Sequence, residues 1–320
     1  MPLCESPTES HTEAEVNVLG ARMHYLHAGS GRPMVLIHGL VGSSCNWRRN
    51  LSVLAQEASV YAIDQLNMGK SQRIHGLDAS LEATADRVAA FMDAVGIESA
   101  EIVGHSHGGS VALMLAARHP ERVRSLILFA PANPFSRLDR VLVRLYTTPL
   151  GRVAALTAPH LPIRLQRFAL GRMYGNPARI ADGCLQGYTD GLRVPGTIRH
   201  ILTIVRGWFA NMAALKAVLP RVASVPTLLI WGDRDRAVDH HSATQLQRVL
   251  WNSELRIMRG AGHIVFEELP EESNRMMLDW MHRDFAASHV SGGVELRSSR
   301  LPRGMRPASV VAAAKTSAAV

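Results

Sequence analysis

Residues 100–118 read AEIVGHSHGGSVALMLAAR and contain a short β-branched run, a serine between two histidines, and an alanine-rich run. This order predicts a strand, a sharp turn and a helix. Gly104 to Gly108 fit the pattern Gly-x-Ser-x-Gly, in which small residues let the strand and the helix approach closely. The turn would expose the Ser106 hydroxyl and leave the His107 N–H at a helix N-terminus, where a developing anion is stabilised. The stretch therefore predicts nucleophilic catalysis, although a five-residue pattern can also recur by chance.

The chain on both sides of this stretch alternates between apolar strands and helices. An amphipathic helix is predicted from Leu81 to Val95, and Gly96 ends it. The apolar runs predict further strands within 16–27 and at 34–38, 59–64, 123–130, 226–233 and 254–258, and further helices at 241–250 and 270–285. Continuously apolar strands are typical of a parallel sheet that is covered on both faces. The predicted fold class is α/β, with a mostly parallel twisted sheet and helices on both faces.

Changes in composition predict the domain organisation. Residues 1–14 are polar and are predicted to form a disordered leader, and residues 289–320 a disordered basic tail. The α/β core is expected at 15–133 and 221–288. Between these two parts, prolines and helical apolar spacing predict a helical cap at 134–220.

Composition excludes several classes of protein. The chain has 320 residues, 47% of them apolar, which is enough to bury a large core. It contains no run of 18 uncharged apolar residues and no signal-peptide pattern near residue 1, so the expected location is cytoplasmic. Cys4, Cys45 and Cys184 are scattered and odd in number, which favours free thiols over a disulfide framework or a zinc cluster.

The net charge of +8 is concentrated in two regions. Residues 134–220 carry 12 Lys/Arg against 3 Asp/Glu, and residues 291–320 carry 5 against 1. A basic surface can bind nucleic acid, anionic lipid or an acidic substrate. No nucleic-acid partner is expected, because the sequence has no helix-turn-helix, zinc-finger or aromatic RNA-binding signature.

The predicted cap is basic and amphipathic. Arg137, Arg140 and Arg144 fall on one helical face, and Arg164 and Arg167 follow among apolar residues. We interpret this pattern first as a solvated outer face on a cap whose apolar side covers the substrate pocket. Peripheral docking on anionic lipid and arginines that hold a substrate carboxylate are the alternatives.

A serine hydroxyl needs a base, and the base needs an orienting carboxylate. Asp233 and Asp235 follow one predicted strand after the cap, and His263 follows the next on a glycine-rich loop. Loops at the carboxyl ends of parallel strands converge on one crevice. Ser106, a carboxylate and His263 are therefore expected to meet.

The order Ser, Asp, His together with four segments resembles the α/β-hydrolase fold superfamily, in its serine-nucleophile branch with a helical cap. The segments are LIHG at 36–39, GHSHGG at 104–109, WGDRD at 231–235, and GAGH at 260–263 with Glu268 and Pro270 following. The resemblance covers about residues 16–286. It implies Ser106 as the nucleophile, His263 as the general base and acid, and Asp235 as the orienting carboxylate. It also implies the N–H groups of Leu40 and His107 as the oxyanion hole, and neither a cofactor nor a metal.

Other residues compete for these roles. Asp233 and Asp239 are alternative triad acids; Asp139 lies too deep in the insert, and Asn133 occupies the position where some relatives carry the acid. His38 is expected to brace a loop, and Asp64 is expected to be structural.

The histidine pairs could also be metal ligands. His105 and His107 are instead expected to pack around the turn, and neither this pair nor His240–His241 has a Cys, Asp or Glu partner at usable spacing.

These residues favour a serine hydrolase that cleaves a carboxylic ester of a fairly apolar substrate. A carbon–carbon bond hydrolase of the meta-cleavage-product type is an alternative, although its relatives usually carry tryptophan where this chain has Ile264. A cofactor-free perhydrolase and a non-catalytic ligand-binding relative also remain open. Epoxide hydrolases and haloalkane dehalogenases need a carboxylate nucleophile, and Ser106 stands there instead.

Overall fold

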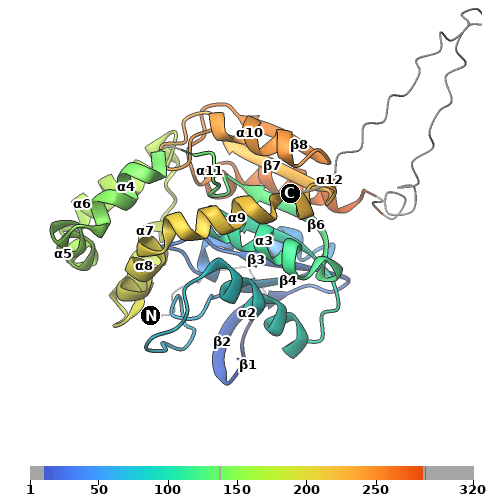
Figure 1. The fold of residues 1–320 in the computed structure, drawn as a ribbon, viewed down its shortest axis with the longest axis horizontal. Coiled ribbons are helices and arrows are strands. Elements are labelled where there is room, and N and C mark those ends of the chain that lie inside the picture. The colour runs from blue at the N-terminus through green and yellow to red at the C-terminus, as the bar shows by residue number, and fades with distance from the viewer. Residues whose placement is uncertain (1–10, 137, 284, 286–320) are drawn as a thin grey trace, which may run out of the picture. The chain divides into compact units, whose positions relative to one another are not determined.

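One eight-stranded sheet organises the molecule (Figure 1). The computed structural model describes residues 11–136, 138–283 and 285, and gives no side-chain surroundings for 138–142. The strands are β1 (Thr12–Val18), β2 (Ala21–Ala28), β3 (Arg32–Ile37), β4 (Ala58–Ile63), β5 (Ala100–His105), β6 (Val123–Phe129), β7 (Thr227–Gly232) and β8 (Ser253–Met258). Their order is β1-β2-β4-β3-β5-β6-β7-β8; β2 pairs antiparallel with β1 and β4, and every other pair is parallel. The mostly parallel sheet predicted from the sequence is confirmed.

Alternate residues along a strand point to opposite faces of the sheet and belong to two separate hydrophobic clusters. In β3, Val35 and Ile37 join one cluster, while Met34 and Leu36 join the other. The first cluster takes apolar residues from α2 (Leu81–Ala94), α3 (His107–Arg118), α9 (Trp208–Val222) and α10 (His241–Val249). The second takes them from η1 (Ser44–Trp47), α1 (Leu51–Leu54), α11 (Val265–Glu268) and α12 (Pro270–Met281). Helices therefore cover both faces, as predicted.

The first strand begins earlier than expected. Residues 1–10 and 286–320, which hold most of the predicted leader and the predicted tail, lie outside the described residues. Thr12 to Ala14 were placed in the leader, but they belong to β1 and pair with His27 to Tyr25 of β2. The misassigned residues are mostly exposed because β1 is an edge strand, so their sequence lacks a buried apolar signal.

The insert between β6 and β7 is helical, as predicted. Its helices are α4 (Leu138–Thr147), α5 (Pro149–Thr157), η3 (Ala158–His160), α6 (Ile163–Gly171), η4 (Pro177–Arg179), α7 (Cys184–Arg193), α8 (Thr197–Arg206) and α9. Leu215, Leu219 and Val222 of α9 are almost fully buried in the first core cluster, so the last helix of the predicted cap packs as part of the core.

The outer segment of the insert, residues 149–171, has the opposite character. Only Gly151, Pro159, Leu170 and Gly171 are buried there. The expectation that the apolar side of this region covers a pocket is wrong for α5 and α6, because their large apolar side chains other than Leu170 remain exposed. Arg137 and the side chain of Arg140 lie outside the described part of the chain.

No single helix among the described residues is long and apolar enough to cross a membrane. The pair α8 and α9 meets the length and composition criteria only when taken together, and it is bent by 60° between the two helices.

Candidate active site

Ser106 sits at the sharp turn between β5 and α3. Its φ of +52° and ψ of −118° are unusual for a residue with a side chain and cost about 1–3 kcal/mol. The surroundings hold this geometry: the Ser106 N–H donates to Phe129 O at 3.0 Å, and Ser106 O accepts from Ala132 N at 2.9 Å and Gly109 N at 3.0 Å. The turn thus places the serine where strand and helix meet.

Glycines, which have no side chain, occupy the tightest positions around this turn. A Cβ on Gly104 would lie 2.6 Å from Gly108 O, and a Cβ on Gly108 would lie 2.4 Å from Ile37 O. On the facing loop, a Cβ on Gly39 would lie 3.3 Å from Ser106 Cβ. The glycines therefore bring β3, β5 and α3 together around the serine.

Asp235 and His263 form a buried pair on the loops after β7 and β8. His263 Nδ1 lies 2.8 Å from Asp235 Oδ2, and the two side chains are 7% and 0% exposed. Asp235 Oδ1 also accepts from the N–H groups of Ala237 at 2.8 Å and Val238 at 3.0 Å. Nδ1 must carry a proton to donate to the carboxylate, and in the neutral form of such a ring Nε2 has a free lone pair. This is the protonation state that a general base needs.

The competing carboxylates have other partners. Asp233 Oδ1 accepts from Gly260 N at 2.7 Å, and Asp239 Oδ1 accepts from His241 N at 3.0 Å. Asn133 is buried and donates to Pro131 O and Ser242 Oγ, each at 3.0 Å. Of these residues, only Asp235 holds the histidine.

The loop after β3 supplies the candidate oxyanion hole. Within the described chain, the N–H groups of Leu40 and His107 donate to no other protein group. His38 braces this loop, as the sequence predicted: its Nε2 accepts from Gln65 N at 3.1 Å, and its Nδ1 donates to Gly39 O at 2.7 Å. Burial lowers the pKa of His38 and keeps the ring neutral.

Asp64 has a structural role, because its carboxylate accepts hydrogen bonds from several segments. Its carboxylate accepts from Ser44 N at 2.6 Å, Lys70 N at 2.7 Å and His24 Nδ1 at 2.8 Å. Burial by itself would raise the pKa of Asp64, but the hydrogen bond and charge of His24 lower it. This carboxylate fastens residue 44, at the far end of the candidate oxyanion loop, to the loop after β4.

The two histidines beside the nucleophile differ. His105 Nε2 lies 3.2 Å from His263 O, and the two rings are 4.7 Å apart. His107 is buried, and neither of its ring nitrogens has a hydrogen-bond partner among the described residues. Burial, followed by the nearby His200, lowers the pKa of His107 to about 3. Both rings pack around the turn, as the sequence predicted, and His107 is neutral there.

Glu268 joins the His263 loop to the insert. Its fully buried carboxylate accepts from Gly262 N, Gly175 N and Asn176 N at 2.8–2.9 Å, and it forms an ion pair with Arg179 at 3.1 Å. In addition, the His263 N–H donates to the backbone carbonyl of Met173 at 2.7 Å. The insert therefore holds the backbone of the candidate base.

The adjacent Glu267 makes a second junction between the end of the His263 loop and the insert. Its buried carboxylate accepts from Tyr174 OH at 2.8 Å, Tyr188 OH and Cys184 Sγ at 3.1 Å, and Arg48 at 3.2 Å. Burial and the Glu267 charge raise the pKa of Cys184 to about 11.

We call residues 173–188 the clasped segment. Sequence reasoning missed this role, although two adjacent acids within the otherwise apolar IVFEELP at 264–270 were the available signal.

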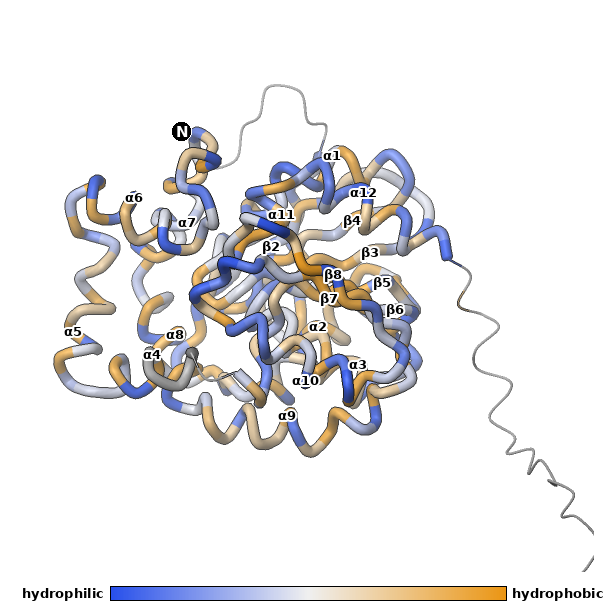
Figure 2. Tube along the Cα trace, turned by 90° about the horizontal axis from the view of Figure 1, so that it is seen from above, coloured by the Kyte–Doolittle hydropathy of each residue, from blue (hydrophilic) through white to orange (hydrophobic). Residues whose placement is uncertain are grey.

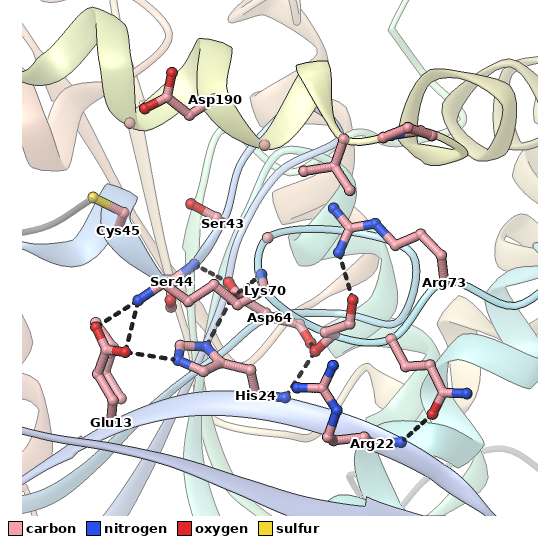
Figure 3. A pocket seen from close by; sticks show the side chains of 18 residues that line it. Glu13, Arg22, His24, Ser43, Ser44, Cys45, Asp64, Lys70, Arg73 and Asp190 are labelled. Carbon is pink, nitrogen blue, oxygen red and sulfur yellow. Dashed lines mark hydrogen bonds and ion pairs between the residues drawn. The ribbon is translucent and has the colours of Figure 1, made fainter. Parts of the chain in front are cut away.

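A cavity of about 480 Å³ lies beside the candidate oxyanion loop, and Ser106, Asp235 and His263 are not among its lining residues. Figure 3 shows its charged wall, where Lys70 pairs with Glu13 at 2.6 Å and His24 with Asp64 at 2.8 Å. Gly187 to Pro195 of the insert close the opposite side. The cavity is therefore a separate feature from the buried Asp235–His263 pair.

One expectation about metals needs correction. Asp239, His240 and His241 can offer ligand atoms within 4.8 Å of one another, so the carboxylate partner that the sequence seemed to lack is the preceding residue. The three residues are consecutive at the start of α10 and at most half-buried. His105 and His107 do not belong to this group of possible metal ligands.

Three comparisons place the chain among known proteins. The model of the α/β-hydrolase fold matches residues 32–169. An uncharacterised protein of Mycobacterium tuberculosis is 28% identical over 317 residues, which cover 95% of this chain and 90% of the relative. The 2-hydroxy-6-oxononadienedioate/2-hydroxy-6-oxononatrienedioate hydrolase of Burkholderia vietnamiensis is 28% identical over 295 residues, covering 86% and 98%.

A solved structure extends the similarity to the whole fold. A membrane phospholipase A, described as a bacterial virulence factor, is 28% identical with a TM-score of 0.71, and the match covers 85% of this chain and 86% of that one. The matched model, the sheet order and the serine turn agree on one assignment. The chain has the fold of the α/β-hydrolase superfamily, and named hydrolases are among the proteins similar to it.

Proposed function

We propose that this enzyme is a serine hydrolase that cleaves a carboxylic ester of a fairly apolar substrate through an acyl-enzyme intermediate. One observation carries the proposal: His263 Nδ1 is held at 2.8 Å by the buried Asp235, which leaves Nε2 free to accept a proton. Ser106 lies in a strained turn at the same sheet edge. This chemistry requires no cofactor.

The proposed reaction has two halves. Nε2 of His263 takes the Ser106 proton while Oγ attacks the ester carbonyl, and the N–H groups of Leu40 and His107 stabilise the oxyanion. The imidazolium, stabilised by Asp235, then gives its proton to the leaving alcohol. A water molecule activated by His263 next hydrolyses the acyl-enzyme, releases the acid and restores the Ser106 hydroxyl.

Carbon–carbon bond hydrolysis is the second candidate. The Burkholderia vietnamiensis relative, which supports it, is named as a hydrolase of oxononadienedioates. The same triad would serve that reaction. The buried Ile264 after the candidate base argues for the ester, because similar carbon–carbon hydrolases usually have tryptophan there. A perhydrolase would add hydrogen peroxide to the same acyl-enzyme.

A substrate screen tests the proposal. The full chain is assayed with p-nitrophenyl esters of rising acyl length, with and without peroxide, beside a dienoate diketone. We expect ester turnover and covalent labelling of Ser106 by a fluorophosphonate. Ser106→Ala should abolish the labelling and lower kcat at least about 10⁴-fold. Turnover of the dienoate alone would favour the second candidate, and failure to label Ser106 would refute the serine mechanism.

A further inference from the structure

The outer segment of the insert, residues 149–171, exposes an unusual amount of apolar surface. It contains seven of the fifteen large exposed hydrophobic residues in the described chain. They are Leu150 (79% exposed), Val153 (57%), Leu156 (50%), Leu161 (42%), Ile163 (63%), Leu165 (51%) and Phe168 (69%). Monomeric soluble proteins rarely leave apolar side chains grouped in this way unless the surface binds something.

The segment also carries positive charge without compensation. Arg152, Arg164 and Arg167 are exposed, and none of them forms an ion pair with a described residue. No acidic residue occurs in the sequence between Asp139 and Asp182. The partner of this surface must therefore accept both apolar side chains and arginines.

The segment lies away from the sheet. In Figures 1 and 2, α5 and α6 occupy the end of the insert that is farthest from the strands. Most residues of both helices are exposed. Gly151, Pro159, Leu170 and Gly171 are the only buried residues of the segment. A surface that projects in this way can be covered without any contact to the catalytic residues.

We propose that the outer segment docks the enzyme on an anionic phospholipid membrane. Leucine, isoleucine and phenylalanine side chains would enter the acyl boundary, and the arginines would bind lipid phosphates. A second copy of the chain fits less well, because a two-fold interface would bring the three arginines against three more without a carboxylate. Nucleic acid would leave the apolar side chains in water.

Vesicle flotation of the full chain tests the proposal. The probes are vesicles of phosphatidylcholine alone and of phosphatidylcholine with about 30% phosphatidylglycerol, at low and high salt. We expect binding to the anionic vesicles that weakens with salt. Leu150→Ser with Phe168→Ser should reduce binding at least about tenfold. Arg164→Ala with Arg167→Ala should reduce it about 30-fold at low salt, since each arginine near the surface contributes about 1 kcal/mol.

Matched variants separate this surface from the rest of the chain. Leu19→Ser with Trp251→Ser changes two hydrophobic residues that are 75% and 71% exposed elsewhere, and Arg248→Ala with Arg275→Ala removes two exposed arginines outside the segment. We expect both pairs to bind as the unsubstituted protein does. Circular dichroism checks that every variant is folded.

Three outcomes would overturn the proposal. The unsubstituted protein could fail to bind anionic vesicles. The outer-segment variants could bind as well as the controls, which would assign binding to another region. Sedimentation could show a dimer that Leu150→Ser with Phe168→Ser makes monomeric, without any vesicle binding, which would assign the surface to self-association.

Discussion

Two neighbouring parts of one insert behave in opposite ways. The clasped segment, residues 173–188, is tied to the His263 loop by Glu267 and Glu268, whose buried carboxylates accept hydrogen bonds from it. The outer segment, residues 149–171, exposes most of its side chains and makes no such junction. An insert that looks like a single helical cap in the sequence therefore combines a fixed support for the candidate base with a free surface.

The two segments differ because charged groups are buried at the clasped segment and exposed at the outer segment. A buried carboxylate is retained only if several donors compensate for its lost hydration. Backbone N–H groups provide them for Glu268, and the side chains of Tyr174, Tyr188 and Arg48 provide them for Glu267. Breaking such a junction leaves the donors buried and unpaired. In the outer segment the charges are exposed arginines, which lose little by remaining in water.

Removing Glu268 should have the largest effect. Glu268→Ala leaves the N–H groups of Gly262, Gly175 and Asn176 without an acceptor, so we expect the free energy of unfolding to fall by about 3–5 kcal/mol. Ester turnover should fall as well, because the His263 loop loses its support. Urea unfolding and p-nitrophenyl ester kinetics measure the two effects. Glu271→Ala is the control, since that side chain is 80% exposed; equal losses in both variants would refute the clasp.

A glycine pair tests the same contrast with a single methyl group. A Cβ on Gly175, in the clasped segment, would lie 2.3 Å from the carbonyl oxygen of Gly260, so Gly175→Ala should cost about 1–3 kcal/mol. On Gly171, in the outer segment, the nearest atom would be Pro177 Cβ at 3.5 Å. Gly171→Ala should be neutral or stabilise by up to about 1 kcal/mol. Thermal unfolding compares them, and equal shifts would contradict the contrast.

The smallest effect is expected in thiol reactivity. Cys184 is 1% exposed, and its pKa is raised to about 11 by burial and Glu267. At pH 8 its alkylation by iodoacetamide should be at least about 100-fold slower than in the unfolded chain, because so little thiolate is present. Peptide mass spectrometry reports the rate. Glu267→Ala should accelerate it, and Leu150→Ser should leave it unchanged; rapid alkylation of the folded protein would refute a closed clasp.

The pattern of local residues determined the fold and the candidate triad. Apolar strands alternating with helices predict a covered parallel sheet, and loops at the carboxyl ends of its strands must converge. That reasoning put Ser106, Asp235 and His263 at one edge, and Asp235 does hold His263 in the structure. The preference for Asp235 over Asp233 came from the resemblance, and the structure gives Asp233 a different partner, Gly260 N.

Tertiary structure decided what depends on distant partners. The sequence places Glu267 and Glu268 in an apolar stretch but does not identify their partners, which are donors more than 70 positions away. His107 was expected to pack around the turn, but only the packed structure shows that both of its ring nitrogens lack partners. The amphipathic pattern of α6 identified an apolar face, but whether that face meets a pocket or solvent depends on how the helix packs. Sequence periodicity specifies which side of a helix is apolar, and only the three-dimensional packing determines what that side contacts.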